Sequence, residues 1–570
     1  MADGPPYIIS DWQSAAAGKR KTLLDSIPQS YILPGPLALK AATTGLLPGD
    51  VSILACGILS PLDIEITSIE EAPVLLERIA RKQYSAVQVT EAFCKRAAIA
   101  QQCTGCLSEL MFEKAVARAR EVDDYLSLHG KLVGILHGLP VSLKDCFDVE
   151  GVNTNAGLVS WLPYIAPKNS SVVKGLLSAG AVLFAKTSSS QSLLMVESIN
   201  NIFGTVKNPY NLALTVGGSS GGEACLVAAK GSILGSGTDG GGSLRFPSAH
   251  CGLWALKPSK FRISGSGVSS PRSGSESVNQ ASGPLARSVA GLELWVEAHL
   301  LSEPWNTEPD CIPMPWKSAE AQRADTPLTI GVIWDDGVVQ PTPPVKRALQ
   351  ITVEVLSQAG HTIKHLPSSR IFPLHRQSYA CTMLSNVQDG GRCAMAHIAA
   401  SNEPVVPRTA TGSDASALTA AEVFENHLLR SRLAAAYNEL WIEYGLDTIL
   451  VPSVAHPANP HGKYIGNSYA TVYNMLDYVT GCVPVTIVDE QLDVAGREWY
   501  DGEIYGRIEE VRFPYDLGDK EMKELYTSPK VFKDSPVGVQ IVCRRLQEEK
   551  CIGILKELEA LLKGETEIRD

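Results

Sequence analysis

Glycine and serine crowd residues 215–270 more densely than the segments on either side, and this region most restricts how the chain can fold. Glycine serves where backbone must approach another group closely or adopt dihedral angles closed to other residues. A flexible linker would show a similar composition. Here, however, the glycines alternate with short apolar runs such as Ala224–Ala229, and a linker has nothing to bury. We therefore predict an ordered loop, helix, strand and loop.

The overall composition indicates a large folded protein with an acidic balance of charge. Of its 570 residues, 45% are hydrophobic and 19% are charged, which supplies ample apolar material for a buried core. Length alone leaves the number of domains open. The formal net charge of -11 argues against a nucleic-acid partner and against an anionic membrane surface, because both favour basic patches. We expect a small or neutral substrate.

Targeting signals and cysteine usage point to the cytoplasm. The N-terminus shows no basic region followed by an apolar stretch, and no apolar run approaches the roughly 20 residues of a membrane span. The 13 cysteines are odd in number and lack a framework spacing, which fits reduced thiols. Cys103 and Cys106 form a lone C-x-x-C pair, for which two ordinary thiols near a turn are favoured over a redox or zinc half-site.

Local patterns outside the central region predict further helices and strands. Ser85 and Gln88 form a capping box at the start of a helix. One face of this helix should be buried, and it consists of Val89, Ala92, Phe93, Arg96, Ala97 and Ala100. Residues 329–334 predict a strand, and residues 344–359 predict a helix that Gly360 ends. The second half thus alternates between β and α.

Three short segments carry side chains capable of catalysis: Pro140–Asp145, Gly217–Gly222 and Gly237–Arg245. In them, Lys144 lies 75 residues before Ser219, and Ser219 lies 24 residues before Ser243. These motifs at these spacings resemble the amidase signature family. Weaker similarity extends the resemblance over residues 71–560, at Asn208–Tyr210, Phe246–Ser248, Gly252–Pro258 and Pro536–Gln540.

The resemblance implies an α/β fold, the amidase signature fold, in which helices flank both faces of a mixed central β-sheet. We expect residues 1–70 to form an N-terminal helical extension and residues 71–570 to form the amidase signature catalytic domain. The family uses no cofactor and no metal ion, and we expect none here.

The chemistry of amide hydrolysis explains why these residue types are needed. A serine hydroxyl is a poor nucleophile and must lose its proton to a neighbouring base as it attacks. No histidine lies in these motifs, and Lys144 can be the base only if burial lowers its pKa from about 10.4. The resemblance implies that Ser243 is the nucleophile and that Ser219, held by a cis peptide, relays the proton.

Glycines lead directly into the implied nucleophile. Gly240, Gly241 and Gly242 carry no side chains that would block a cluster of backbone N–H groups. By resemblance, these N–H groups and that of Ser243 form the oxyanion hole. Gly240 departs from the family, where isoleucine or alanine is frequent, and this leaves the hole looser.

Two further assignments concern the surroundings of this loop. Asp239 and Arg245 bracket it at a separation that allows an ion pair, although surface pairs of this kind contribute little. The resemblance also places Leu193 beside the bound acyl group, on the short match at Gln191–Ser192. Val216 stands where many relatives have proline.

A rival motif overlaps the second segment. Gly217–Gly221 also satisfies G-x-S-x-G, with an apolar run before it and a helical run after it, as in an α/β-hydrolase with Ser219 as nucleophile. That interpretation leaves Lys144 and residues 240–245 unexplained. Residues 171–174 fit S-x-x-K without its companion motifs, and an ordinary core helix explains them better. A degenerate amidase without activity is disfavoured because all three reactive side chains are present.

The sequence therefore predicts an amidase that hydrolyses a carboxylic amide to an acid plus ammonia or an amine through a seryl acyl-enzyme. Residues 334–339 and Glu223 most resemble acetamidase-type and fatty-acid-amide-hydrolase-type members, which favours a small aliphatic or aryl amide. One alternative is a long-chain acyl amide or ester, and another is an amidotransferase A-type subunit that works with a partner. A homodimer is compatible with the sequence.

Overall fold

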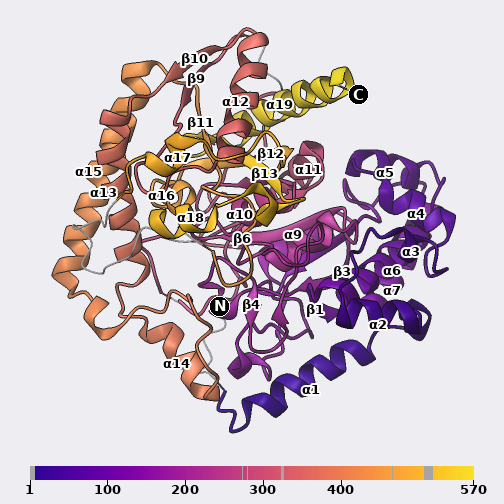
Figure 1. Cartoon of the computed structure of the whole chain (residues 1–570). Coiled ribbons are helices and arrows are strands. Elements are labelled where there is room, and N and C mark those ends of the chain that lie inside the picture. The colour runs from indigo at the N-terminus through magenta and orange to yellow at the C-terminus, as the bar shows by residue number, and fades with distance from the viewer. Residues whose placement is uncertain are drawn as a thin grey trace.

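A computed structural model describes residues 7–272, 274–278, 280–322, 326–464, 466–505 and 518–569 (Figure 1). Within them, a central sheet of 11 strands has the order β1-β3-β2-β6-β8-β7-β12-β13-β11-β9-β10. A separate pair, β4 and β5, forms a second small sheet. The strand bounds are β1 (Leu107–Leu110), β2 (Pro140–Lys144), β3 (Val182–Thr187), β4 (Ile199–Asn200), β5 (Gly204–Thr205), β6 (Leu234–Asp239), β7 (Trp254–Lys257), β8 (Ala281–Ala286), β9 (Thr329–Val332), β10 (Thr362–His365), β11 (Thr448–Pro452), β12 (Val479–Ile487) and β13 (Pro536–Cys543).

The central sheet is mixed. Strands β3, β2 and β6 run parallel, as do β11, β9 and β10, whereas the strands from β6 through β8, β7, β12 and β13 to β11 pair antiparallel. Every residue of β2, β3, β6, β7, β8, β11 and β13 is buried, as expected of strands with both faces covered by helices. The predicted fold class is confirmed.

Helices surround the sheet on all sides in Figure 1. Their bounds are α1 (Trp12–Asp25), α2 (Gly35–Thr43), α3 (Val51–Leu54), α4 (Pro61–Ser68), α5 (Ala72–Ala80), α6 (Ala86–Thr104), α7 (Phe112–His129), α8 (Ser171–Ser178), α9 (Gly221–Ala228), α10 (Arg245–His250), α11 (Val289–Leu301), α12 (Pro343–Gln358), α13 (Ser368–Asn386), α14 (Arg392–Ser401), α15 (Ala420–Tyr444), α16 (Ser468–Met475), α17 (Arg497–Asp501), α18 (Asp519–Leu525) and α19 (Glu548–Arg569). Among the described residues, no helix is long and apolar enough to cross a membrane.

Several elements predicted from local patterns are present. The capping box of Ser85 and Gln88 starts α6, and all six residues of its predicted buried face are buried. Strand β9 and helix α12 lie where a strand and a helix were predicted, and Gly360 follows α12 with a φ of 92°. The glycine-rich region is ordered and contains α9, β6, α10 and β7.

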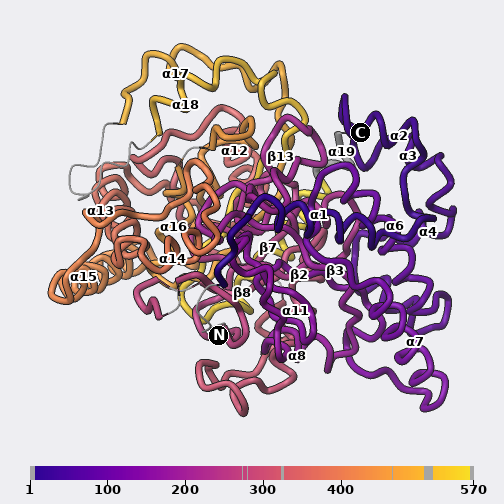
Figure 2. Tube along the Cα trace, turned by 90° about the horizontal axis from the view of Figure 1, so that it is seen from below, coloured from indigo at the N-terminus to yellow at the C-terminus, as the bar shows by residue number. Residues whose placement is uncertain are grey.

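The N-terminal segment forms helices that pack on the rest of the chain. Helix α1 crosses the underside of the molecule (Figure 2). Its Lys19 forms an ion pair with Glu109 of β1. Helix α4 packs on α6 and is tied to it by an ion pair of 2.8 Å between Asp63 and Lys95. Ahead of α1, the N–H of Ile9 donates to the carbonyl of residue 400 at the end of α14, at 3.0 Å. The segment ahead of α1 is thereby tied at Ile9 to a distant part of the chain.

Candidate active site

The three motif segments converge at one edge of the sheet. Lys144 is the last residue of β2, and Asp239 is the last residue of β6, the parallel neighbour of β2. Because parallel neighbours end at the same edge, these strands deliver both side chains to one place. Ser219 lies two residues before α9, and Ser243 lies two residues before α10. Both serines therefore stand where loops leave this edge.

Lys144 makes two hydrogen bonds that connect the segments. Its Nζ lies 2.7 Å from Ser219 Oγ and 2.8 Å from Thr238 Oγ1. The peptide bond between Gly218 and Ser219 is cis. The N–H of Ser220 donates to the carbonyl of Ser243 at 3.2 Å, which ties the two serine loops together. Ser219 and Ser243 line the same small cavity, which we call the chamber.

Burial controls the protonation of Lys144. The side chain is fully buried, and this lowers its pKa from 10.5 to about 8, because the charged form loses its hydration. Cys146, Asp239 and Glu223 act in the opposite direction, since negative charge nearby favours the ammonium. Burial is the larger effect. At neutral pH the amine form is therefore accessible, as a base requires.

Glu223 is a buried acid close to this lysine, and sequence analysis gave it no role. It lies on α9, accepts a hydrogen bond from Ser142 Oγ of β2, and accepts another at 2.6 Å from Thr187 Oγ1 of β3. Burial raises its pKa to about 7, against the effect of these hydrogen bonds. Glu223 thus fastens α9 to the two strands beside Lys144.

Asp239 shapes the glycine loop before Ser243. Its carboxylate accepts the N–H of Gly242 at 2.7 Å and that of Leu244 at 3.1 Å. Of the four N–H groups predicted for the oxyanion hole, that of Gly242 is therefore engaged within the loop. Those of Gly240, Gly241 and Ser243 have no acceptor among the described residues.

The ion pair between Asp239 and Arg245 forms, but in the core instead of at the surface as the sequence suggested. Both side chains are fully buried, with 2.9 Å between Arg245 Nη2 and Asp239 Oδ1. The pair holds the pKa of Asp239 well below its usual range. Arg245 is further held by acceptors from distant elements, namely the Ala470 carbonyl, Asn474 Oδ1 and Gln540 Oε1. These contacts fix the loop in one conformation.

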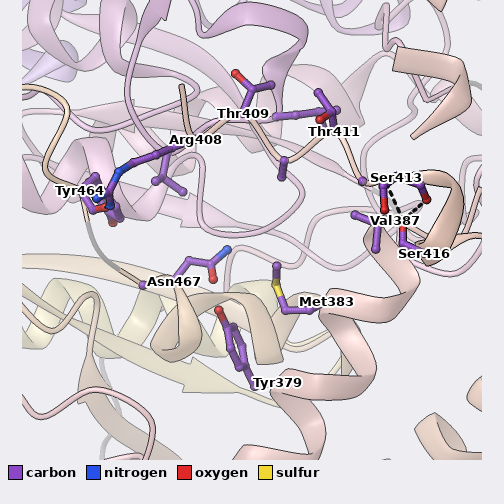
Figure 3. A pocket seen from close by; sticks show the side chains of 15 residues that line it. Tyr379, Met383, Val387, Arg408, Thr409, Thr411, Ser413, Ser416, Tyr464 and Asn467 are labelled. Atoms are coloured by element: carbon purple, nitrogen blue, oxygen red, sulfur yellow. Dashed lines mark hydrogen bonds between the residues drawn. The ribbon is translucent and has the colours of Figure 1, made fainter. Parts of the chain in front are cut away.

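A larger outer cavity lies next to the chamber. The chamber has a volume of about 80 Å³, and its walls include Gly240, Gly241 and Leu193. The outer cavity has a volume of about 520 Å³, and Figure 3 shows Arg408 and Thr409 on one side of it with Tyr379 on the other. Five residues line both spaces: Leu194, Val196, Met383, Ala410 and Asn467. The two spaces are therefore neighbours that share a wall.

The remaining sequence motifs lie outside this site. Cys103 and Cys106 are buried and form no disulfide. Residues 171–174 belong to α8, where Lys174 pairs with Glu308 at 2.9 Å. No group of three or more His, Cys, Asp and Glu side chains is placed to hold a metal ion in the part of the chain that the structure describes.

Comparison with known proteins identifies the family. The family model described as Amidase matches residues 88–552. The chain belongs to the amidase family. This amidase is 35% identical to the acetamidase of Emericella nidulans over 97% of its own length and 98% of the relative. It is equally identical to the acetamidase of Aspergillus oryzae, over 97% of this chain and 99% of that one.

The solved structure of a fatty acid amide hydrolase matches the amidase with a TM-score of 0.89 and 32% identity, over 97% of this chain and 95% of that one. The amidase thus has the amidase signature fold and is an acetamidase-like amide hydrolase. Two polar residues of its site escaped the sequence analysis, Thr238 beside Lys144 and Arg272 in the chamber wall. Thr238 lies within the third motif segment but was given no role there, and Arg272 belongs to no motif with a recognisable spacing.

Proposed function

We propose that this amidase hydrolyses a carboxylic amide through an acyl-enzyme on Ser243, with Ser219 and Lys144 moving the proton. The observation that carries the proposal is the 2.7 Å contact between Lys144 Nζ and Ser219 Oγ, beside the chamber that Ser243 also lines. A buried lysine whose pKa is lowered to about 8 supports its role as the base.

The proposed reaction has two halves. In the first, neutral Lys144 takes the proton of Ser219 while Ser219 takes that of Ser243, and Ser243 Oγ attacks the carbonyl carbon. The proton then passes to the nitrogen of the leaving amine, and the C–N bond breaks. In the second half, water loses a proton along the same path and attacks the acyl-enzyme, which releases the acid and restores Ser243.

The oxyanion of each tetrahedral intermediate requires hydrogen-bond donors. The N–H groups of Gly240, Gly241 and Ser243, which meet no acceptor in the described part of the chain, support an oxyanion hole at this loop. The N–H of Gly242, in contrast, acts through Asp239 to fix the loop. Donors fixed in advance stabilise the developing charge without reorganisation during the reaction.

The substrate proposed from the relatives is a small amide. Relatives named acetamidase align over nearly the whole chain, and a chamber of about 80 Å³ suits a short acyl group. Residues 1–70 as an extension and residues 71–570 as the catalytic domain remain our proposed division of the chain. A cytoplasmic location and a homodimer remain predictions from the sequence.

The nucleophile is testable without knowledge of the substrate. We would incubate the protein with a fluorophosphonate, measure its intact mass and map the modified peptide. The expected result is one adduct on Ser243, absent in Ser243→Ala and unchanged in Ser357→Ala, an exposed serine on α12. An adduct on Ser219 would support the α/β-hydrolase alternative instead. No adduct would contradict an acyl-enzyme on Ser243.

A further inference from the structure

A single charged side chain, Arg272, is found in the wall of the chamber among the residues that the structure describes. The other walls consist of serine, threonine, glycine, amide and apolar residues. Arg272 is partly buried, and burial lowers its pKa because the guanidinium loses hydration there. Placing a guanidinium in this small cavity beside Ser243 costs hydration free energy, which a bound anionic group would offset.

The position of the guanidinium is set by helix α13. Arg272 Nη1 donates to the carbonyl of Asn386 at 3.3 Å and to its Oδ1 at 3.0 Å. On the other side, Arg272 Nη2 lies 3.6 Å from the point where a Cβ on Gly240 would stand. The free edge of the guanidinium therefore reaches the loop on which the oxyanion hole is proposed.

Arg272 forms no ion pair within the described part of the chain. The carboxylate that acts on it electrostatically is Asp389. That carboxylate accepts the N–H groups of Gly391 and Cys393 at the start of α14. Both neutral partners of Arg272 come from Asn386, so its charge is left uncompensated by direct contact.

The outer cavity, like the chamber, has a positively charged lining residue. Arg408 is the one charged side chain in its described lining (Figure 3). Arg408 is paired with Glu521 at 3.1 Å, so it contributes less than Arg272. The linings of the chamber and the outer cavity together contain two arginines and no described acidic side chain, in a chain with a net charge of -11. Clefts lined by one sign of charge concentrate ligands of the opposite sign.

We propose that this amidase prefers amides that carry a carboxylate on a short arm, which Arg272 binds while Ser243 attacks the amide carbonyl. The proposal rests on the proposed function. An arginine offers two parallel N–H donors that match the geometry of a carboxylate, and the pairing is strongest where water is largely excluded. The small chamber limits the arm to a few carbon atoms. The net charge of the whole chain suggested a small or neutral substrate, but it does not report the local charge of the chamber.

The test uses two pairs of amides that differ only by a carboxylate in place of a methyl group. Succinamate and butanamide differ on the acyl side, whereas N-acetylglycine and N-ethylacetamide differ on the amine side. For each pair we would measure the ratio of kcat/KM for the anionic amide to that for the neutral one. The variant is Arg272→Gln, and the control is Arg370→Gln, which removes the same charge from an exposed ion pair with Glu443.

The wild-type ratio should favour the anionic amide in at least one pair, and Arg272→Gln should lower that ratio by about tenfold or more. Taking the ratio cancels any loss common to both substrates, including partial unfolding. Arg370→Gln should keep the wild-type ratio.

A wild type that hydrolyses the neutral amides through Ser243 with no preference for either anion would overturn the role of Arg272 and leave the proposed function intact. An unchanged kcat/KM ratio in Arg272→Gln would likewise overturn the role of Arg272 and leave the proposed function intact. If none of the four amides is hydrolysed in a manner that depends on Ser243, the proposed function fails for this substrate class, and the inference fails with it.

Discussion

Replacing Thr238 with valine would remove one of the two oxygen atoms that lie within hydrogen-bonding distance of Lys144 Nζ, while it keeps the size of the side chain. The hydroxyl of Thr238 stabilises the ammonium more than the amine, because a hydrogen bond to a charged donor is the stronger one. Its loss should therefore lower the pKa of Lys144 further. If neutral Lys144 is the base, the variant should reach full activity at a lower pH than the wild type.

The size of the shift follows from the energies of such bonds. A hydrogen bond to a charged group contributes about 1.5–3 kcal/mol and one between neutral groups about 0.5–1.5 kcal/mol, so the ammonium loses about 1.3 kcal/mol more than the amine. This difference corresponds to about one pKa unit. From a wild-type pKa of about 8, the inflection should move to about 7. At pH 7 the neutral fraction would then rise from about one tenth to about one half.

The assay is the dependence of kcat/KM on pH between about 6 and 10 for an uncharged amide, since kcat/KM reports the pKa of the free enzyme. Wild type should rise about tenfold per pH unit below its inflection and level off above it. Thr238→Ser, which keeps the hydroxyl, should retain the wild-type inflection. An inflection in Thr238→Val that stays in place or moves to higher pH would refute the reasoning.

Three further predictions concern the same site. The pKa of Lys144 is 10.5 when exposed and about 8 in the fold, so the contribution of Lys144 to the free energy of unfolding should rise by up to about 3 kcal/mol between pH 8 and 10.5. In urea unfolding, the difference in the free energy of unfolding between wild type and Lys144→Met should increase by that amount over this pH range; a difference that does not change with pH would contradict the lowered pKa. In Gly242→Ala, the new Cβ would stand 2.2 Å from the ring of Phe246 at a φ of 110°, and the variant should lose about 2 kcal/mol or more, whereas Gly240→Ala meets nothing closer than 3.4 Å and should keep its stability. Equal melting temperatures for these two variants would argue against this geometry. Asp239→Asn should cost about 3–5 kcal/mol at pH 7 because it leaves Arg245 buried without its partner. The ionised Asp239 stabilises the fold above its unfolded pKa of 3.8, and this stability is lost as the pH falls below that value, so acid unfolding should depend less steeply on pH in the variant.

Local sequence patterns predicted the secondary-structure elements that are stabilised by interactions between residues close in the sequence. The capping box at Ser85 fixed the start of α6, because both of its hydrogen bonds lie within four residues. The motif spacings predicted Lys144, Ser219 and Ser243 as the reactive residues, and the structure brings their segments to one edge of the sheet. Alternating glycines and apolar runs likewise distinguished an ordered region from a linker.

Features that depend on distant contacts were out of reach. We expected the pair between Asp239 and Arg245 to lie at the surface. The pair is buried because Asn474 of α16 and Gln540 of β13 pack against it, and both lie more than 200 residues away in the sequence. The bond that engages the N–H of Gly242 is local, but it depends on the rotamer of Asp239, which also accepts a hydrogen bond from the distant Asn474. Arg272 lies in a loop without a motif, and its neighbour Asn386 comes from the end of α13.

Residues at the ends of the parallel strands and residues in the connecting segments differ in how freely they can change during evolution. Lys144 and Asp239 sit at the ends of buried strands, where an insertion or a change of side chain would disturb the sheet. Helix α13 supplies part of the walls of the chamber and the outer cavity, but much of both walls comes from connecting segments, such as the one with Arg272 between β7 and β8 and the one with Arg408 between α14 and α15. Such segments tolerate changes in length and sequence. Changes in these segments can therefore alter which acyl or amine group of the substrate is accepted, while the residues proposed to cleave the amide bond stay the same.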